Sequence, residues 1–404
     1  MTSLERKPRS RMLIPLLVAM LGIALGAGGI ALLHPVISHP TPQLAASPAA
    51  QTAPRSLSET AIRARIEPSV VDVTATLTYD DETASGTGFV IDARTGLILT
   101  NNHVIRDATT VMVTVPATGQ MYPAAIVGTD VTADIAVLQI KPVAGLPGAP
   151  LGDSATVATG ALVISFGNQA GAGGLPAVAP GVITGTARTI QADDGAAGFS
   201  ETLHDMLATS ARIEPGDSGG PLAGAAGTVL GVDTAAGTGG TDTGYAIPIN
   251  AAMAAEREIT SGRQGQGISL GIDGFLGVIV GSGTTRSPAT QLEQERSVRT
   301  GSSVPATATN CAPTAGEATR PALIAPAPAG ALVLDVLCGT GAATAGITPG
   351  DVITAANGRQ VDSPQALTAI VSEYQPGTVL QVTWVSTTGA ARTARVRLSP
   401  APAV

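Results

Sequence analysis

The sequence contains few aromatic and few charged residues. Phe, Trp and Tyr together make up 2% of its 404 residues, so its cores must be packed with Val, Ile, Leu and Ala. The 22 Lys and Arg residues are scattered among 30 Asp and Glu residues, and the net charge is -8. Without a basic patch, the composition argues against a nucleic-acid partner.

Cysteine is also scarce, and the only two are Cys311 and Cys338. Neither has the spacing of a metal site or of a redox pair, and we predict no metal and no cofactor. A bond between them would close a loop of about 28 residues and stabilise the fold by roughly 3–4 kcal/mol. Two buried free thiols are the alternative. The Gly-rich segment 167–174 lacks the Lys and Ser/Thr of a phosphate-binding loop.

Long helical periodicity is absent beyond the N-terminal segment, whereas short apolar runs punctuated by Gly, Pro and Asp recur. This pattern predicts a mainly β protein with long loops. At 404 residues the chain exceeds one domain. The expected strands cover residues 70–77, 111–115, 161–166, 181–187 and 229–234.

The N-terminus carries the one long apolar run, 22 uncharged residues from 12 to 33. As a helix this run would span roughly 30 Å of hydrocarbon. Four Lys and Arg residues precede it, which predicts a cytoplasmic end at 1–11, a single-pass anchor at 12–33 and an extracytoplasmic remainder in a bacterial-type envelope. Residues 34–58 form a Pro/Ala-rich linker. A signal peptide cleaved near residues 45–50 is the alternative.

The most informative stretch is Gly216-Asp217-Ser218-Gly219-Gly220-Pro221. Glycines beside a serine allow a sharp turn that brings backbone N–H groups next to the hydroxyl. We therefore predict Ser218 as a nucleophile and an oxyanion hole formed by Gly216, Asp217 and Ser218, with the N–H groups of Gly216 and Ser218 as the main donors. An ordinary Gly-rich turn is the alternative.

A serine nucleophile needs a base, and the chain has only four histidines. His34 and His39 adjoin the apolar N-terminal run, and His204 lies in a polar stretch expected to be a solvated loop or helix. His103 follows two strand-like runs, 86–92 and 97–100, and sits where a β-hairpin should end. We predict His103 as the base; a surface histidine is the alternative.

The acid that orients the histidine could be Asp130, Asp134 or Asp153. Asp134 opens an apolar run that ends at Ile140, and a carboxylate at the mouth of a buried strand is costly unless it is paired. Asp130 and Asp153 are more typical of turns. We predict Asp134. The resulting order, His103, Asp134, Ser218, is that of chymotrypsin-type proteases.

From about residue 84 to residue 400, the chain resembles the HtrA/Deg family of serine proteases with a C-terminal PDZ domain. The resemblance implies a chymotrypsin-like double six-stranded β-barrel at 59–262, peptide-bond hydrolysis in unfolded, damaged or signalling proteins, and a homotrimer. It rests on the motifs Gly86-Thr87-Gly88-Phe89-Val90-Ile91, Leu99-Thr100-Asn101-Asn102-His103-Val104, Asp134-Ile135-Ala136-Val137-Leu138, Leu151-Gly152-Asp153-Ser154, Gly216-Asp217-Ser218-Gly219-Gly220-Pro221-Leu222 and Gly244-Tyr245-Ala246-Ile247-Pro248.

The resemblance also assigns the residues that would bind substrate. It places the primary specificity pocket, for small or medium aliphatic side chains, at Val232, Asp233, Thr234 and Ala235, with Arg212-Ile213 as a partial wall.

An α+β PDZ domain is expected at 268–400, with a Ser/Thr/Pro/Ala-rich insertion at about 282–329. Its helix should start at Ser363-Pro364, and Asn357-Gly358 indicates a hairpin turn. The residues expected to hold the carboxylate of C-terminal peptides are Phe275, Leu276, Gly277 and Val278.

The sequence departs from the family pattern near the nucleophile. Asp217 stands where the family usually has Asn, and without a zymogen cleavage motif it needs another partner or solvent. Arg212 and Glu214 make the preceding segment more polar and are expected to be solvated surface charges. The alternatives are that they pair with each other or with Asp217, or that they tune the activation loop. Residues 167–174 replace a usual Gly-Asn-Pro-Phe-Gly stretch and begin a predicted flexible regulatory loop that runs to about residue 180.

The predicted function is that of a membrane-anchored extracytoplasmic serine endopeptidase whose PDZ domain recruits substrates or regulates access. A catalytically silent chaperone or scaffold and an esterase that uses the same triad are the alternatives.

Overall fold

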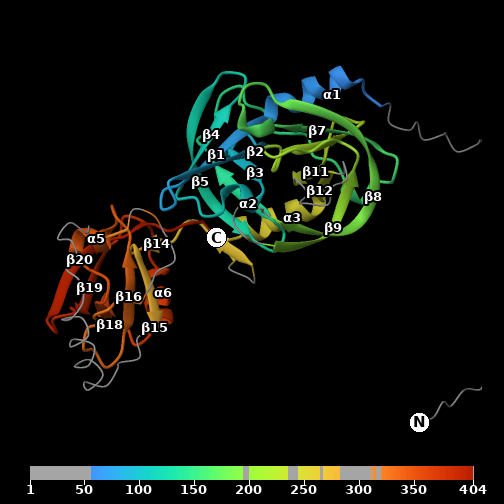
Figure 1. Ribbon diagram of the computed structural model, residues 1–404. Helices are drawn as coiled ribbons and strands as arrows, with labels where there is room; N and C mark the ends of the chain where they lie inside the picture. Colours follow the sequence, from blue (N-terminus) through green and yellow to red (C-terminus); the bar gives the residue numbers. More distant parts are fainter. Residues whose placement is uncertain are drawn as a thin grey trace, which may run out of the picture. The chain divides into compact units, whose positions relative to one another are not determined.

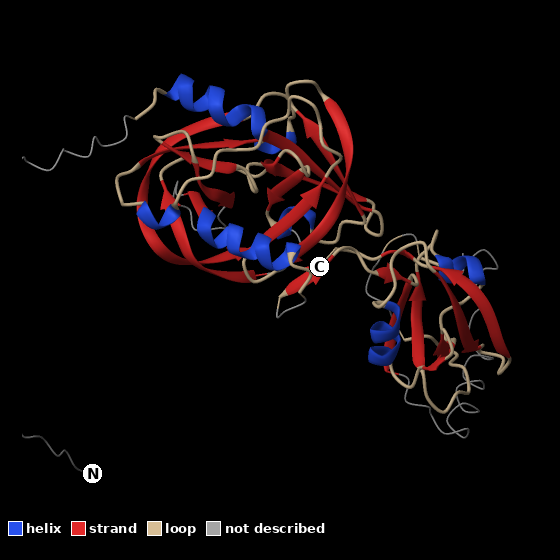
Figure 2. Cartoon of the chain, turned by 180° about the vertical axis from the view of Figure 1, so that it is seen from behind, coloured by secondary structure: helices blue, strands red, loops and turns tan. Residues whose placement is uncertain are grey.

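The computed structural model describes residues 56–193, 200–234, 244–263, 267–282, 311–312, 314 and 320–403 (Figure 1). The predicted anchor, His34, His39 and most of the predicted insertion lie outside these residues. No helix within these ranges is long and apolar enough to cross a bilayer. Strands dominate the described chain, with short helices around them (Figure 2), as the punctuated apolar runs predict.

The first barrel is formed by β1 to β6. Its strands hydrogen-bond in the order β5-β4-β1-β2-β3-β6, and a β5–β6 pairing closes the ring. Aliphatic side chains such as Val73, Val90 and Ile98 fill it, as the shortage of aromatics requires. The strands are β1 (Val70–Leu77), β2 (Glu82–Asp92), β3 (Leu97–Thr100), β4 (Thr110–Val115), β5 (Gln120–Asp130) and β6 (Ile135–Gln139).

Three short helical segments precede or interrupt the strands of the first barrel. Helix α1 (Glu59–Ile66) begins at Ser58, whose hydroxyl accepts the Ala61 N–H, and the turn η1 (Glu67–Ser69) leads from it into β1. Helix α2 (Asn102–Ile105) follows β3 directly, so the run around His103 continues as a single helical turn rather than a loop.

The second barrel is a closed ring in the order β10-β11-β12-β9-β8-β7. Its strands are β7 (Leu162–Gly167), β8 (Ala177–Asp193), β9 (Ser200–Thr209), β10 (Pro221–Gly224), β11 (Val229–Thr234) and β12 (Gly244–Pro248). Two short turns, η2 (Ser154–Thr156) and η3 (Gln169–Gly171), precede β7 and β8, and α3 (Ile249–Thr260) follows β12.

Two expectations for the second barrel were wrong. The loop predicted to run to about residue 180 ends earlier, because Ala177 to Pro180 pair with Ile164 to Gly167 on β7. His204 lies on β9 rather than in a loop or helix, since this strand pairs with the long strand β8.

The short strand β13 (Ile268–Leu270) moves the expected domain boundary. It pairs with Gly128 to Asp130 at the end of β5 and so belongs to the sheet of the first barrel. The C-terminal domain therefore begins after Leu270 rather than at residue 268.

The C-terminal domain is a sheet with two helices. Its strands run in the order β15-β16-β17-β19-β20, β18 pairs with β17, and β14 pairs with β21. Trp384 is buried in its aliphatic core. The elements are β14 (Gly274–Phe275), β15 (Val278–Ser282), β16 (Ala331–Val336), α5 (Gly341–Ala345), β17 (Val352–Ala356), β18 (Arg359–Gln360), α6 (Pro364–Val371), β19 (Val379–Val385), β20 (Ala391–Arg397) and β21 (Ser399–Pro400).

A turn, a helix cap and a disulfide predicted from the sequence are present in this domain. Asn357 and Gly358 both have positive φ and join β17 to β18 as a two-residue hairpin turn. The Ser363 hydroxyl accepts the Ala366 N–H and caps α6. Cys311 and Cys338 form a disulfide with their Cα atoms 5.0 Å apart.

Candidate active site

His103 and Asp134 are in direct contact. The imidazole Nδ1 lies 2.8 Å from Oδ2 of Asp134, and the backbone N–H of His103 donates to Oδ1 at 3.0 Å. The Asp134 side chain is 2% exposed and the His103 side chain 25%. Since Nδ1 faces the carboxylate, Nε2 is the nitrogen left to receive a proton from another group.

The loop before β6 holds Asp134 in place. The backbone of Asp134 has φ 51°, in the left-handed region, and the Asp134 carbonyl accepts the side-chain N–H of Asn101 at 2.9 Å. The two other aspartates considered from the sequence are engaged in turns of their own. Asp130 accepts the N–H groups of Thr132 and Ala133, and Asp153 caps the short turn η2.

Ser218 lies in the tight loop between Gly216 and Pro221 and is 4% exposed. The glycines are required by close backbone contacts. A Cβ on Gly219, whose φ is +87°, would lie 2.1 Å from the carbonyl oxygen of Thr87 and 2.3 Å from Oγ1 of Thr100. A Cβ on Gly86 would lie 2.6 Å from Val104 and 3.2 Å from the Ser218 carbonyl oxygen. The serine loop thus packs against the residues on both sides of His103.

Thr87 fixes this packing, and the sequence analysis gave it no role. Its N–H donates to the Ser218 carbonyl at 2.9 Å, and its hydroxyl donates to the Gly216 carbonyl at 2.7 Å. The hydroxyl also accepts the Asn168 N–H at 2.8 Å. Its place between Gly86 and Gly88 was the only available signal.

The segment before Ser218 forms a turn. The N–H of Asp217 donates to the Glu214 carbonyl at 2.9 Å, with Pro215 and a positive-φ Gly216 at the two central positions. This bond occupies the Asp217 N–H, which leaves the N–H groups of Gly216 and Ser218 as the candidate oxyanion donors. Arg212 and Glu214 form an ion pair at 2.5 Å, which was one of the alternatives to solvated surface charges.

A family model described as a trypsin-like peptidase domain matches residues 86–232, a range that contains all three residues of the predicted triad. Serine protease PepD of Mycobacterium tuberculosis is 29% identical over 431 residues, which cover 98% of this chain and 80% of PepD. The periplasmic pH-dependent serine endoprotease DegQ of Escherichia coli is 28% identical over 301 residues, and these cover 74% of this chain and 55% of DegQ.

The chain is similar to serine proteases of the HtrA/Deg family. A solved structure of the HtrA-type protease AlgW with a tripeptide is 26% identical, with a TM-score of 0.45 over 86% of this chain and 99% of that one.

Of the residues predicted for the specificity pocket, three lie at the end of β11. Val232, Asp233 and Thr234 are fully or almost fully buried, and Ala235 lies outside the described residues. Burial raises the pKa of the Asp233 carboxyl well above its ordinary value, and the charge of Asp217 adds to the shift. Burial likewise raises the pKa of Asp217.

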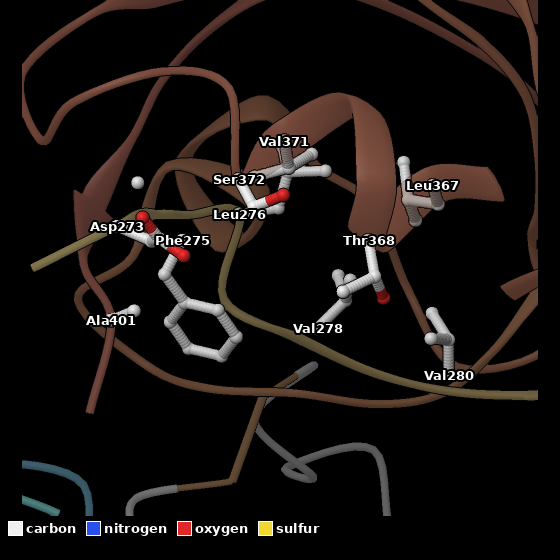
Figure 3. A pocket seen from close by; sticks show the side chains of 11 residues that line it. Asp273, Phe275, Leu276, Val278, Val280, Leu367, Thr368, Val371, Ser372 and Ala401 are labelled. Carbon is white, nitrogen blue, oxygen red and sulfur yellow. The ribbon is translucent and has the colours of Figure 1, made fainter. Parts of the chain in front are cut away.

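A cavity of about 190 Å³ lies in the C-terminal domain. Val278 and Val280 on β15 form one side, and Leu367 and Val371 on α6 form the other (Figure 3). Strand β15 is at the edge of its sheet, so its second edge has no strand partner in the described structure. Asp273 also lines the cavity, and burial raises its pKa.

Three of the four residues predicted to bind a carboxylate line this cavity. Phe275, Leu276 and Val278 line it, and Gly277 has φ +87°. A Cβ on Gly277 would lie 2.1 Å from Thr340, so only glycine fits. The carbonyls of Leu276 and Gly277 accept N–H groups from Ala342 and Leu337, at 3.0 and 2.9 Å, which fixes the orientation of the loop.

Proposed function

We propose that this protein is an extracytoplasmic serine endopeptidase, anchored by residues 12–33, that cleaves unfolded, damaged or signalling polypeptides with the triad His103, Asp134 and Ser218. One observation carries the proposal: a buried carboxylate binds both the backbone and the imidazole of His103, and the residues that flank His103 pack against the Ser218 loop. The activities named for PepD and DegQ support the same reaction.

The proposed reaction follows from the hydrogen bonds at His103. Ser218 Oγ attacks the scissile carbonyl carbon while Nε2 of His103 takes the hydroxyl proton. Asp134 keeps the other ring nitrogen protonated and stabilises the imidazolium that forms. The N–H groups of Gly216 and Ser218 donate to the oxyanion. His103 then gives its proton to the leaving amine. In the second half of the reaction, His103 takes a proton from a water molecule that attacks the acyl group, and then returns it to Ser218 Oγ as the product acid leaves.

The C-terminal domain is proposed to be a PDZ domain that reads the ends of polypeptides. An extended peptide would add to the free edge of β15 and place apolar side chains between Val280 and Leu367. The N–H groups of Leu276 and Gly277 would hold its terminal carboxylate. This arrangement would recruit substrates or regulate access to the barrels.

The proposed location rests on the apolar run and the basic residues before it, together with the periplasmic location in the name of DegQ. The disulfide agrees with an oxidising compartment. A homotrimer is proposed by analogy with the family alone.

The proposed function is tested by active-site labelling. The full-length protein is incubated with a fluorophosphonate probe, and the modified residue is identified by mass spectrometry. Labelling at Ser218 is expected, with none in Ser218→Ala. Ser261→Ala is the matched control, because Ser261 is exposed at the end of α3 and should not affect labelling.

Failure of the wild-type protein to react, with or without a C-terminal peptide, would favour the silent chaperone or scaffold. Hydrolysis of esters but not of a peptide substrate would favour the esterase.

A further inference from the structure

Two carboxyl groups are buried close to Ser218, one on the loop that carries it and one on the strand bonded to that loop. Asp217 precedes Ser218 and is 4% exposed, and Asp233 on β11 is fully buried. Strand β11 is bonded directly to this loop: the Gly219 N–H donates to the Asp233 carbonyl at 2.8 Å, and the Asp233 N–H donates to the Gly220 carbonyl at 2.7 Å. A movement of Asp233 therefore shifts Gly219 and Gly220, the two residues that follow Ser218.

Neither carboxyl group has a cationic partner in the part of the chain that the structure describes. Asp217 accepts the Glu214 N–H through Oδ2 at 2.9 Å, and Asp233 accepts the Ser165 hydroxyl through Oδ2 at 2.6 Å. The Oδ1 atom of each is buried without a hydrogen bond. An ionised carboxylate in such a site is costly, so burial favours the neutral acid.

The charged groups of the turn add to this preference. Glu214 carries a like charge that opposes ionisation of Asp217, a smaller effect than burial. The charge of Asp217 in turn opposes ionisation of Asp233, again after burial. Arg212 could offset these charges, but it is paired with Glu214 at 2.5 Å.

Among the described residues, the strands beside β11 place uncharged groups against Asp233. Strand β7 contributes the Ser165 hydroxyl, and β12 places Ala246 opposite Asp233. Asp233 is thus the more deeply buried of the two carboxyls, and the one that has a hydroxyl rather than a backbone N–H as its partner.

We propose that Asp233 is a positioning residue that acts as a neutral carboxylic acid and keeps the Ser218 loop aligned with β11. The inference rests on the proposed protease function and adds a proton requirement to it. In this arrangement Asp217 is the ionised carboxylate and accepts the Glu214 N–H, whereas Asp233 is the protonated carboxylic acid. When Asp233 loses this proton at high pH, the negative charges of Asp233 and Asp217 repel each other, and the loop loses its alignment.

The test compares pH profiles of labelling. The second-order rate of fluorophosphonate reaction with the full-length protein is measured from about pH 6 to about pH 10. For the wild type, the rate should rise as His103 loses its proton and then fall by about tenfold per pH unit above the pKa of Asp233.

Asp233→Asn resembles the neutral acid and should stay within about threefold of the wild-type rate at neutral pH, without the fall at high pH. Asp233→Leu should lose about 10- to 100-fold at every pH. Asp72→Asn is the matched control: Asp72 is also buried, but on β1, so the fall should remain. An unchanged fall in Asp233→Asn, or a neutral-pH loss equal to that of Asp233→Leu, would overturn the proposal.

A readout without catalysis separates this proposal from the protease function. Infrared spectra at about pH 8 should show a protonated carboxyl band in the wild type that is missing from Asp233→Asn. A band that this variant leaves unchanged would overturn the assignment of the proton. If the wild type shows the band but reacts with no probe at any pH, the protease function fails and the neutral Asp233 stands.

Discussion

Both carboxylate oxygens of Asp134 are used by one residue, His103. One oxygen accepts the backbone N–H at 3.0 Å, and the other lies 2.8 Å from Nδ1 of the imidazole. The first bond fixes the start of α2 and the second fixes the imidazole ring. Asp134 therefore orients both the His103 side chain and the helical turn that carries it.

Asp134→Asn should reduce the rate of peptide hydrolysis by about 10⁴, because an amide would favour the wrong imidazole tautomer. The measurement is kcat with a fluorogenic peptide, with circular dichroism to confirm the fold. Asp130→Asn is the control, since Asp130 only supports its own turn. Equal losses in the two variants, or a larger loss in the control, would show that Asp134 does not have this role.

Gly219→Ala should destabilise the protein by about 3 kcal/mol or more and abolish labelling of Ser218, because the new Cβ would overlap the Thr87 carbonyl. Gly160→Ala is matched to it, since Gly160 has a similar φ of +89° but no atom within 4 Å of its Cβ position. Only the conformational cost of about 1 kcal/mol should apply there. Urea unfolding curves of both variants test this, and equal costs would argue against the steric contact.

Asp72 should make stability depend on pH. Burial raises its pKa from 3.8 to about 6, so the folded state binds this proton more tightly than the unfolded state. Protonated Asp72 therefore contributes its full share of the folding free energy below about pH 4. This contribution is lost as the pH rises through about 6. Asp72→Asn should be more stable than the wild type by about 1–3 kcal/mol at neutral pH, with the difference shrinking toward pH 4. A difference that does not vary with pH would contradict this assignment.

Asp273 should weaken binding of free C-termini, because it lines the same cavity as the proposed carboxylate loop. Asp273→Asn should tighten binding of a peptide ending in Val-COO⁻ by about two- to fivefold at neutral pH. Fluorescence anisotropy measures this, with the amidated peptide as the control. An equal gain for both peptides would mean that Asp273 does not act through the charge of the ligand.

Much of the fold could be predicted because the relevant signals are local. Strands β1, β3 and β11 have the bounds expected from their apolar runs. Asn357-Gly358 forms the expected turn and Ser363 caps α6, since each depends only on residues three or fewer positions away.

The rest depends on pairing between distant segments. His204 has polar neighbours yet lies on β9, because the long strand β8 offers it a partner. β13 joins the first barrel through β5, more than a hundred residues earlier in the chain. The role of Thr87 appears only when the first barrel packs against the Ser218 loop, and the contact between Ser165 and Asp233 only when the second barrel closes.

The assignment of β13 to the barrel shortens the connection to the C-terminal domain. Only Gly271, Ile272 and Asp273 separate Leu270 from β14, and a fully extended chain could span no more than about 14 Å between them. A polypeptide whose end is held in the proposed groove would remain on this short tether. The rest of it would then meet the barrels at an effective concentration of about millimolar, whatever its concentration in the surrounding compartment.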